Sequence, residues 1–226
     1  ARADSILGSA NARLGNEQFT SRAPAEVVRK EREKVASLEE QRDKLTRTLT
    51  ALVSHLNDLL TERLVQITAQ RHGLDLARAC WLAFGSEGRG EQTVATDQDN
   101  AIIYEDKANE HREEVRAYFL DFATRVSTAL DKIGIVFCEG ELMAMNPKWT
   151  HSLSHWKRNY DTWISDASQE TAMNYSTFFD CRAIYGDFSL LEELKIYMGE
   201  LLEKAPERFF INLGHNALQY VAPLTF

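Results

Sequence analysis

The sequence contains little cysteine and little proline, with three and four residues respectively in a chain of 226. The cysteines (Cys80, Cys138 and Cys181) are odd in number and widely spaced, and they form no Cys-x-x-Cys pair and no Cys/His zinc pattern. We therefore expect free thiols in a reducing compartment. No apolar run reaches the ~20 residues of a membrane span, and the start of the chain shows no signal-peptide pattern. Together these absences predict a cytoplasmic protein without a membrane partner.

An excess of positive charge is also lacking, because 26 Lys and Arg face 34 Asp and Glu, for a net charge of -8. Proteins that bind nucleic acid without sequence preference usually present a basic surface, so we expect no nucleic-acid partner. The hydrophobic share of 44% and the charged share of 27% are ordinary for a soluble globular protein. The length suffices for one large domain or two small ones.

Composition and patterning divide the chain into four parts. Residues 1–23 are rich in Ala, Ser, Asn and Gly without periodicity and are interpreted as a linker or arm. A helical segment is predicted over 24–73, since Pro24 suits a helix start and Gly73 a helix end. A domain of interleaved strands and helices is predicted over 74–188. The last part, 189–226, is predicted to be a helical region that is truncated at its apolar end.

Leucines recur through the helical segment in a heptad pattern: Leu38, Leu45, Leu52 and Leu59, with Leu49 and Leu56 between them. This spacing is typical of coiled coils and helical hairpins. An unbroken helix of this length would be unusual, so a break is expected at 47–50. The stripe is interpreted first as the inner face of helices packed on the domain, and second as a surface for homodimerisation.

Further along the chain, hydrophobic periodicity predicts strands interleaved with helices. The expected strands are 80–84, 99–104, 135–138 and 177–182, and the expected helices are 108–133, 147–166, 189–203 and one that begins near Ala205. A helical block followed by strands and helices indicates the α+β class.

The turn that follows the first strand has the composition of a phosphate-binding site. Gly85 has no Cβ and allows close approach to a ligand, Ser86 offers a hydroxyl, and a helix start there would present N–H groups to an anion. Arg89 can add a bidentate contact to the same phosphates. The segment is neither a Walker loop nor a dinucleotide-binding fingerprint. Many Gly-Ser turns bind nothing, so this signal is weak by itself.

Asp97 and Asp99 follow about a dozen residues later. Alternate side chains share one face of a strand, so these two carboxylates are expected to converge. Adjacent carboxylates repel each other unless a proton or cation lies between them, and oxygen ligands suit Mg²⁺ or Mn²⁺. This is the arrangement that metal-assisted phosphoryl transfer requires. The alternative is a polar turn before a strand.

The combination of these motifs resembles the polymerase-beta-type nucleotidyltransferase superfamily, and most closely its DUF294 domain, which is related to the PII uridylyltransferase and the glutamine-synthetase adenylyltransferase. The resemblance covers roughly residues 25 to 226. It rests on segments throughout that range: Asn57-Asp58, Leu60-Thr61, Gly85-Ser86-Glu87-Gly88-Arg89, Glu91, Thr96-Asp97-Gln98-Asp99-Asn100, Met143 to Trp149, Phe179-Asp180-Cys181-Arg182 and Gly186-Asp187. It implies a nucleotidyltransferase fold, with a mixed sheet flanked by helices, in a larger signalling protein that carries CBS and cyclic-nucleotide-binding modules.

The superfamily usually has a third carboxylate on a later strand. Asp180 is the candidate, because it lies in an apolar segment and matches the resemblance. Arg182 shares its strand face and is expected either to pair with Asp180 or to reach a phosphate. Glu139 and Glu141, which flank a glycine, are the alternatives to Asp180 as the third acidic residue.

Two histidines, His151 and His155, lie one helical turn apart, and Trp149, Trp156 and Trp163 recur every seven residues. A histidine pair at this spacing can bind zinc, but no third ligand lies nearby in the sequence. The tryptophans are interpreted as core packing.

The sequence thus predicts a metal-dependent enzyme that moves a nucleoside monophosphate from an NTP to a hydroxyl of a protein or small molecule. A catalytically silent nucleotide-sensing module is the alternative. The candidate catalytic and metal-binding residues are Asp97, Asp99 and Asp180, and the cation is Mg²⁺ or Mn²⁺. The candidate nucleotide-binding residues are Gly85, Ser86, Arg89 and Arg182.

Overall fold

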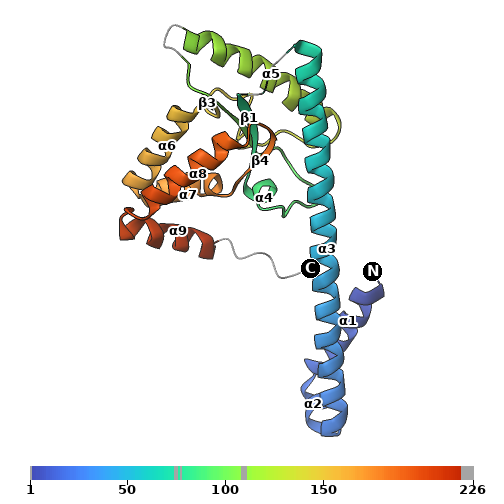
Figure 1. Cartoon of the computed structure of the whole chain (residues 1–226). Coiled ribbons are helices and arrows are strands. Elements are labelled where there is room, and N and C mark those ends of the chain that lie inside the picture. Colours follow the sequence, from blue (N-terminus) through green and yellow to red (C-terminus); the bar gives the residue numbers. More distant parts are fainter. Residues whose placement is uncertain (1, 74–75, 77, 108–110, 220–226) are drawn as a thin grey trace. The chain divides into compact units, whose positions relative to one another are not determined.

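The computed structural model describes residues 2–73, 76, 78–107 and 111–219, and the chain divides into two compact units, Ala1–Leu52 and Val53–Phe226. Helix α3 (Ala25–His72) contributes residues to both units (Figure 1). It runs through positions 47–50 without interruption, so the predicted break is wrong. The residues at that point, Arg47-Thr48-Leu49-Thr50, contain neither Gly nor Pro, and nothing in them stops a helix.

The first unit is helical from its beginning. The stretch expected as an aperiodic linker or arm forms α1 (Arg2–Leu14) and α2 (Glu17–Arg22). Asn16 caps α2, because its side-chain oxygen accepts hydrogen bonds from the backbone N–H groups of the first turn. A small cluster made by Leu7, Ala10 and Val35 packs α1 against α3. That packing compensates for the weak helical pattern of α1.

The leucines of α3 do not form an inner face. Leu45, Leu49, Leu52, Leu56 and Leu59 are exposed, with between 49% and 69% of their surface accessible. Only Leu38 is partly buried, in the cluster with α1. The interpretation of the stripe as a face packed on the domain is therefore wrong for these five positions.

The second unit is built on a mixed four-stranded sheet. Its strands are β1 (Ala79–Phe84), β2 (Asn100–Tyr104), β3 (Thr150–Ser152) and β4 (Cys181–Gly186), in the order β3-β2-β1-β4. β1 is antiparallel to both of its neighbours, and β2 is parallel to β3. The predictions of the first two strands are confirmed. All residues of β1 and β2 are buried, which explains why both strands appear as continuous apolar runs.

Three predicted elements are corrected by the structure. Residues 135–138 form only an isolated parallel bridge, between Val136 and Asp97. The segment 177–182 is not one strand: a 3₁₀ turn, η2 (Ser176–Phe179), precedes β4. The helix expected from 147 begins later, as α6 (Leu153–Asp166), because β3 comes first. Short apolar runs fit either helix or strand, and here pairing with the sheet decides.

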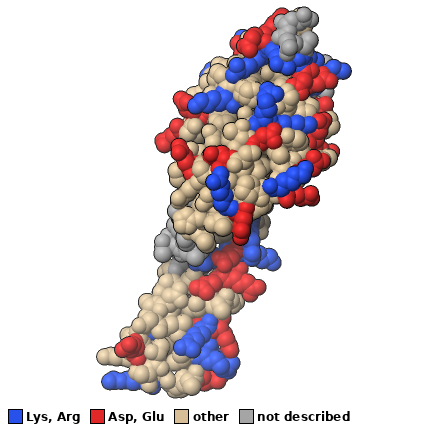
Figure 2. Space-filling model, turned by 90° about the vertical axis from the view of Figure 1, so that its left-hand side faces the viewer, with Lys and Arg blue, Asp and Glu red and all other residues tan. Residues whose placement is uncertain are grey.

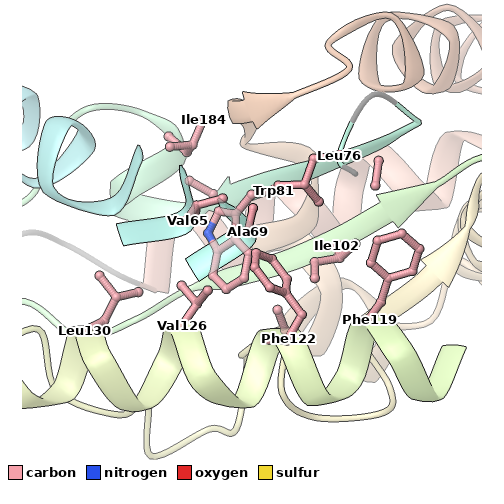
Figure 3. Packing of buried hydrophobic residues seen from close by; sticks show 14 of the residues in the cluster. Val65, Ala69, Leu76, Trp81, Ile102, Phe119, Phe122, Val126, Leu130 and Ile184 are labelled. Atoms are coloured by element: carbon pink, nitrogen blue, oxygen red, sulfur yellow. The ribbon is translucent and has the colours of Figure 1, made fainter. Parts of the chain in front are cut away.

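Helices cover both faces of this sheet. On one face, α5 (Arg112–Lys132) directs Phe119, Phe122, Val126 and Leu130 toward Trp81 and Ile102, as Figure 3 shows. On the other face lie α6 and α8 (Ser189–Leu202), with α7 (Gln169–Tyr175) and α9 (Glu207–Gln219) beside them. Within the described residues, no helix combines the length and apolarity needed to cross a membrane.

The aromatic positions of α6 belong to the second core. Trp156 is fully buried and Trp163 is nearly so, and both pack with Phe178. Trp149 stacks on Trp156 with their ring centroids 6.5 Å apart. The interpretation of the tryptophans as core packing is confirmed.

Candidate active site

The Gly-Ser turn lies at the end of the central strand. Helix α4 (Gly85–Gly88) follows β1 directly and has only four residues. Gly85 has a φ of +55°, and a Cβ there would lie 3.2 Å from an Asp99 carboxylate oxygen and 3.0 Å from Thr177 Cγ2. A glycine is therefore required both by the backbone conformation and by the close approach of Asp99. The side chain of Ser86 is half-buried in this turn.

Asp97 and Asp99 converge, as the two-residue spacing predicted. One ligand atom from each, together with the Cys138 sulfur, lies within 4.8 Å of the others. The backbone explains why Cys138 joins them: the N–H of Gln98 donates to Val136 O, and the N–H of Asn100 donates to Leu142 O. These bonds hold the loop that follows α5 along the edge of the carboxylate pair. The sequence did not predict that Cys138 lies beside the aspartates. A strand expected at 135–138 does not by itself indicate that this segment pairs with Asp97.

Electrostatics show that this pair lacks a compensating charge. The pKa of Asp99 is raised to about 6, first by burial and then by the negative charge of Asp97, while the hydrogen bond with Cys138 opposes the rise. Burial raises the pKa of the Cys138 thiol to about 11, so at neutral pH it is a protonated donor to Asp99. The residues fit a divalent cation that takes carboxylate oxygens, whereas the thiol is no ligand for Mg²⁺.

Asp180 does not belong to this group. Its carboxylate accepts from Arg89 Nη1 at 2.6 Å, and Arg89 Nε also donates to Glu91 at 2.7 Å. The candidate third acid and the candidate phosphate ligand thus pair with each other. Asp180 is nonetheless close to the turn, because a Cβ on Gly88 would clash with the Asp180 carbonyl oxygen.

The two alternative acids lie outside the Asp97, Asp99 and Cys138 group. Glu139 and Glu141 are exposed and flank a turn, and Glu141 has a left-handed backbone with φ of 56°. Neither is grouped with Asp97 and Asp99 in the described part of the chain.

Arg182 pairs with a residue other than Asp180. Its Nη1 and Nη2 each donate to one carboxylate oxygen of Asp58 at 2.8 Å, and Nη2 also donates to the carbonyl oxygen of Glu87 at 2.7 Å. The expected Asp180–Arg182 pair is therefore not formed. Asp58 belongs to the segments that carry the family resemblance. Its role as the partner of Arg182 could not be assigned from the sequence, because it depends on α3 lying beside β4.

Comparison with known proteins gives the family of this arrangement. A family model described as "Putative nucleotidyltransferase DUF294" matches residues 30–170, which is more than half of the chain. The chain belongs to the DUF294 family. A second model, "Valyl tRNA synthetase tRNA binding arm", matches residues 1–53. No curated protein matches the chain. The family description supports a nucleotidyltransferase activity, and the mixed sheet with its flanking helices is consistent with such a domain.

A buried acid supports the turn of this DUF294 domain. Glu87 has only 4% of its surface accessible. Its pKa is raised to about 8, first by burial and then by Asp58, with smaller contributions from Asp99 and Asp97, while Arg182 lowers it. Glu87 is therefore largely protonated at neutral pH in the metal-free domain. The sequence feature that could have indicated this buried acid is a charged residue within a turn that otherwise consists of small residues.

A cleft opens beside the Gly-Ser turn of the domain. It has a volume of about 730 Å³, and its walls include Arg89, Asp180, Thr177 and Asn216. Thr177 also lies against Gly85, the glycine that an Asp99 carboxylate oxygen approaches. Its volume is within the range of about 300–1,000 Å³ typical of small-molecule sites. The side-chain oxygen of Asn216 is buried there without a hydrogen-bond partner.

The two histidines lie elsewhere and form no zinc site. The rings of His151 and His155 stack with centroids 3.6 Å apart. In the described part of the chain, the one group of three potential metal-ligating residues is the Asp97, Asp99 and Cys138 group. Burial, followed by the charge of His155, lowers the pKa of His151 to about 3, so this imidazole is neutral.

Proposed function

We propose that this DUF294 domain transfers a nucleoside monophosphate from an NTP to a hydroxyl group of a protein or small molecule. The observation that carries the proposal is the convergence of Asp97 and Asp99 beside Gly85, which Thr177 contacts from the wall of a cleft of about 730 Å³. Such a pair is suited to holding a cation against a triphosphate, and the cleft is large enough for a nucleotide.

In the proposed reaction, the acceptor oxygen forms a bond to the α-phosphorus of the NTP. The bond between that phosphorus and the oxygen bridging to the β-phosphate breaks, and pyrophosphate leaves with its electron pair. The proton of the acceptor hydroxyl passes to a carboxylate of the site, for which Asp180 is the candidate. Asp97 and Asp99 would hold the cation, which would neutralise charge on the phosphates.

Each residue has a defined part in this proposal. Asp97 and Asp99 hold Mg²⁺ or Mn²⁺ through oxygen, and the Cys138 thiol orients Asp99. Gly85 allows the phosphates to approach the backbone closely, and Ser86 offers them its hydroxyl. Arg89, now paired with Asp180, turns toward the triphosphate when it enters, because a polyphosphate competes for the same guanidinium. That movement frees the Asp180 carboxylate.

The test is transfer of label from each α-³²P NTP, with Mg²⁺, to components of a cell lysate. We expect one or more labelled acceptors with the wild type and none with the Asp97→Asn/Asp99→Asn variant. Glu139→Gln is the matched control, because Glu139 is an exposed acid outside the site, and it should label as the wild type does. Labelling that persists in the double variant contradicts the proposal.

A nucleotide-sensing module without catalysis is the second candidate. The ion pair between Arg89 and Asp180, and the place taken by Cys138 beside Asp97 and Asp99, favour it. NTP and Mg²⁺ would then raise the melting temperature, as a ligand of the native state does, while no lysate component became labelled. Loss of that shift in the double variant would still locate the nucleotide at Asp97 and Asp99.

We propose a signal-transduction context for this activity, and the resemblance to larger signalling proteins supports that proposal. The similarity of residues 1–53 to a tRNA binding arm does not lead us to propose RNA binding. Residues 1–52 carry ten Lys and Arg against eight Asp and Glu. Such a nearly balanced surface releases few counterions from a nucleic acid.

A further inference from the structure

A second polar cavity lies at the opposite end of β2 from the aspartates. It has a volume of about 250 Å³ and is bounded by the end of β2, the start of α5, β3 and the first turns of α6. Asp99 precedes β2 and Tyr104 ends it, so five residues at about 3.4 Å each separate the two sites by roughly 17 Å. The walls of the cavity carry four cations and two imidazoles: Lys107, Arg112, Arg116, Arg158, His151 and His155.

This concentration of positive charge is unusual in a chain of net charge -8. Figure 2 shows Lys and Arg interspersed with Asp and Glu near the upper end of the face it presents. Some surface cations in the second unit have a carboxylate partner, as Arg125 has Asp121 and Lys157 has Glu193. Within the described residues, Arg112, Arg116 and Arg158 form no ion pair. Glu113 also lines the cavity and Lys107 pairs with Glu105 at 3.1 Å, so the three arginines carry its net positive charge.

Hydrogen bonding indicates that an acceptor belongs in this cavity. Arg116 is fixed by a bond from Nη2 to the carbonyl oxygen of Pro147 at 2.7 Å, while its buried Nε has no partner. Arg158 donates weakly to Ser154, at 3.4 Å. A buried guanidinium N–H without an acceptor is costly, and anion oxygens supply the acceptors it lacks.

The histidines add donors without adding charge. His151 is buried, and its imidazole is neutral. The parallel stack with His155 keeps both rings at the cavity wall. Neutral imidazoles and guanidinium groups together suit an anion with several oxygens. Arginine forks match phosphate oxygens in particular.

We propose that this cavity binds a small molecule carrying two or more phosphate groups, at a site separate from the transferase site. A volume of about 250 Å³ falls below the roughly 300–1,000 Å³ that encloses a whole drug-sized ligand, so the cavity takes the phosphate end of its ligand. The negative net charge of the chain opposes a long polyanion such as RNA.

The probe is inorganic pyrophosphate, titrated into the protein by calorimetry at pH 7 in EDTA, so that no divalent cation is bound at Asp97 and Asp99. We expect saturable binding, weaker binding of inorganic phosphate, and roughly a ten- to hundred-fold loss of pyrophosphate affinity in Arg112→Gln/Arg158→Gln. Both arginines are exposed and make no ion pair within the described residues, so the variant should fold.

Two controls separate this site from general charge and from the transferase site. Arg63→Gln/Arg125→Gln removes the same charge from exposed arginines outside the cavity and should retain affinity within about two-fold. Asp97→Asn/Asp99→Asn should also retain it, whether or not the transferase proposal holds. Absent binding, an equal loss in the arginine control, or single-stranded RNA binding more tightly than pyrophosphate through the same arginines would overturn the proposal.

Discussion

Arg182 on β4 and Asp58 on α3 face each other in a two-point ion pair, with both N–O distances 2.8 Å. Their side chains are 35% and 23% accessible, so the pair is partly shielded from water. Because Arg182 also donates to the carbonyl oxygen of Glu87, one guanidinium joins the long helix, the sheet and the Gly-Ser turn. Its primary role is therefore to hold the site together, and a role in nucleotide binding remains a proposal.

Arg182→Gln should lower the free energy of unfolding by about 2–3 kcal/mol, somewhat less than the roughly 3–5 kcal/mol lost when a fully buried pair is broken. Urea denaturation measures this loss. Arg125→Gln, which breaks an exposed pair with Asp121, should cost less than about 1 kcal/mol. A double-mutant cycle with Asp58→Asn should show coupling between the partners, and additive losses would contradict the pairing.

The outline of the domain could be predicted from sequence, while the pairing of its charges could not. The apolar run of β1 and the spacing of Asp97 and Asp99 specified strands and convergence by local rules. The partners of Asp180 and Arg182 depend on where α3 and α4 pass, which no local pattern encodes. Alternation on a strand suggested that these two residues pair, but Asp180 precedes β4 and the alternation does not apply to it.

The loop at 135–142 is a second case in which a local sequence pattern does not predict a contact between distant segments. Its apolar residues predicted a strand, and the structure forms only one bridge there. The hydrogen bonds from Gln98 and Asn100 place Cys138 beside Asp99, a contact between segments about forty residues apart. Sequence also favoured a packed leucine stripe, because it cannot distinguish a heptad that faces its own domain from one that faces another chain.

Glu87 should make stability depend on pH. Its pKa of about 8 in the folded domain exceeds the ordinary value of 4.5. The stability it contributes is therefore fully present below about pH 4.5 and is lost as pH rises through about 8. Relative to Glu87→Gln, the wild type should lose up to about 1.4 kcal/mol per pH unit between pH 5 and 8. Urea unfolding in EDTA at several pH values measures this difference, and Glu139→Gln should show no such slope.

The exposed leucines of α3 lead us to propose that two copies of the chain associate through this helix. Leu45, Leu49, Leu52, Leu56 and Leu59 follow the alternating three- and four-residue spacing of a coiled-coil seam, and all five are exposed. Leu49→Glu/Leu56→Glu should shift the mass measured by light scattering from dimer to monomer without lowering helix content. Ile196→Glu/Ile211→Glu, at two exposed positions on other helices, is the control and should leave the mass unchanged. A wild-type monomer at high concentration would contradict the proposal.

Asp180 presents the sharpest test of how the site works. In the structure its carboxylate is held by Arg89 and lies outside the Asp97, Asp99 and Cys138 group. We therefore expect Asp180→Asn to leave the Mg²⁺-dependent rise in melting temperature unchanged without nucleotide, while labelling of acceptors falls by roughly 10²-fold or more, as loss of a general base does.

A carboxylate placed in that group should have the opposite effect. Cys138→Asp adds a third oxygen ligand beside Asp97 and Asp99, so it should increase the Mg²⁺-dependent rise, and Cys138→Ser should not. If Asp180→Asn instead abolished the Mg²⁺ effect in the absence of NTP, Asp180 would bind the cation directly. Arg89 donates to Oδ2 of Asp180, so Oδ1 would then be the oxygen that reaches the cation.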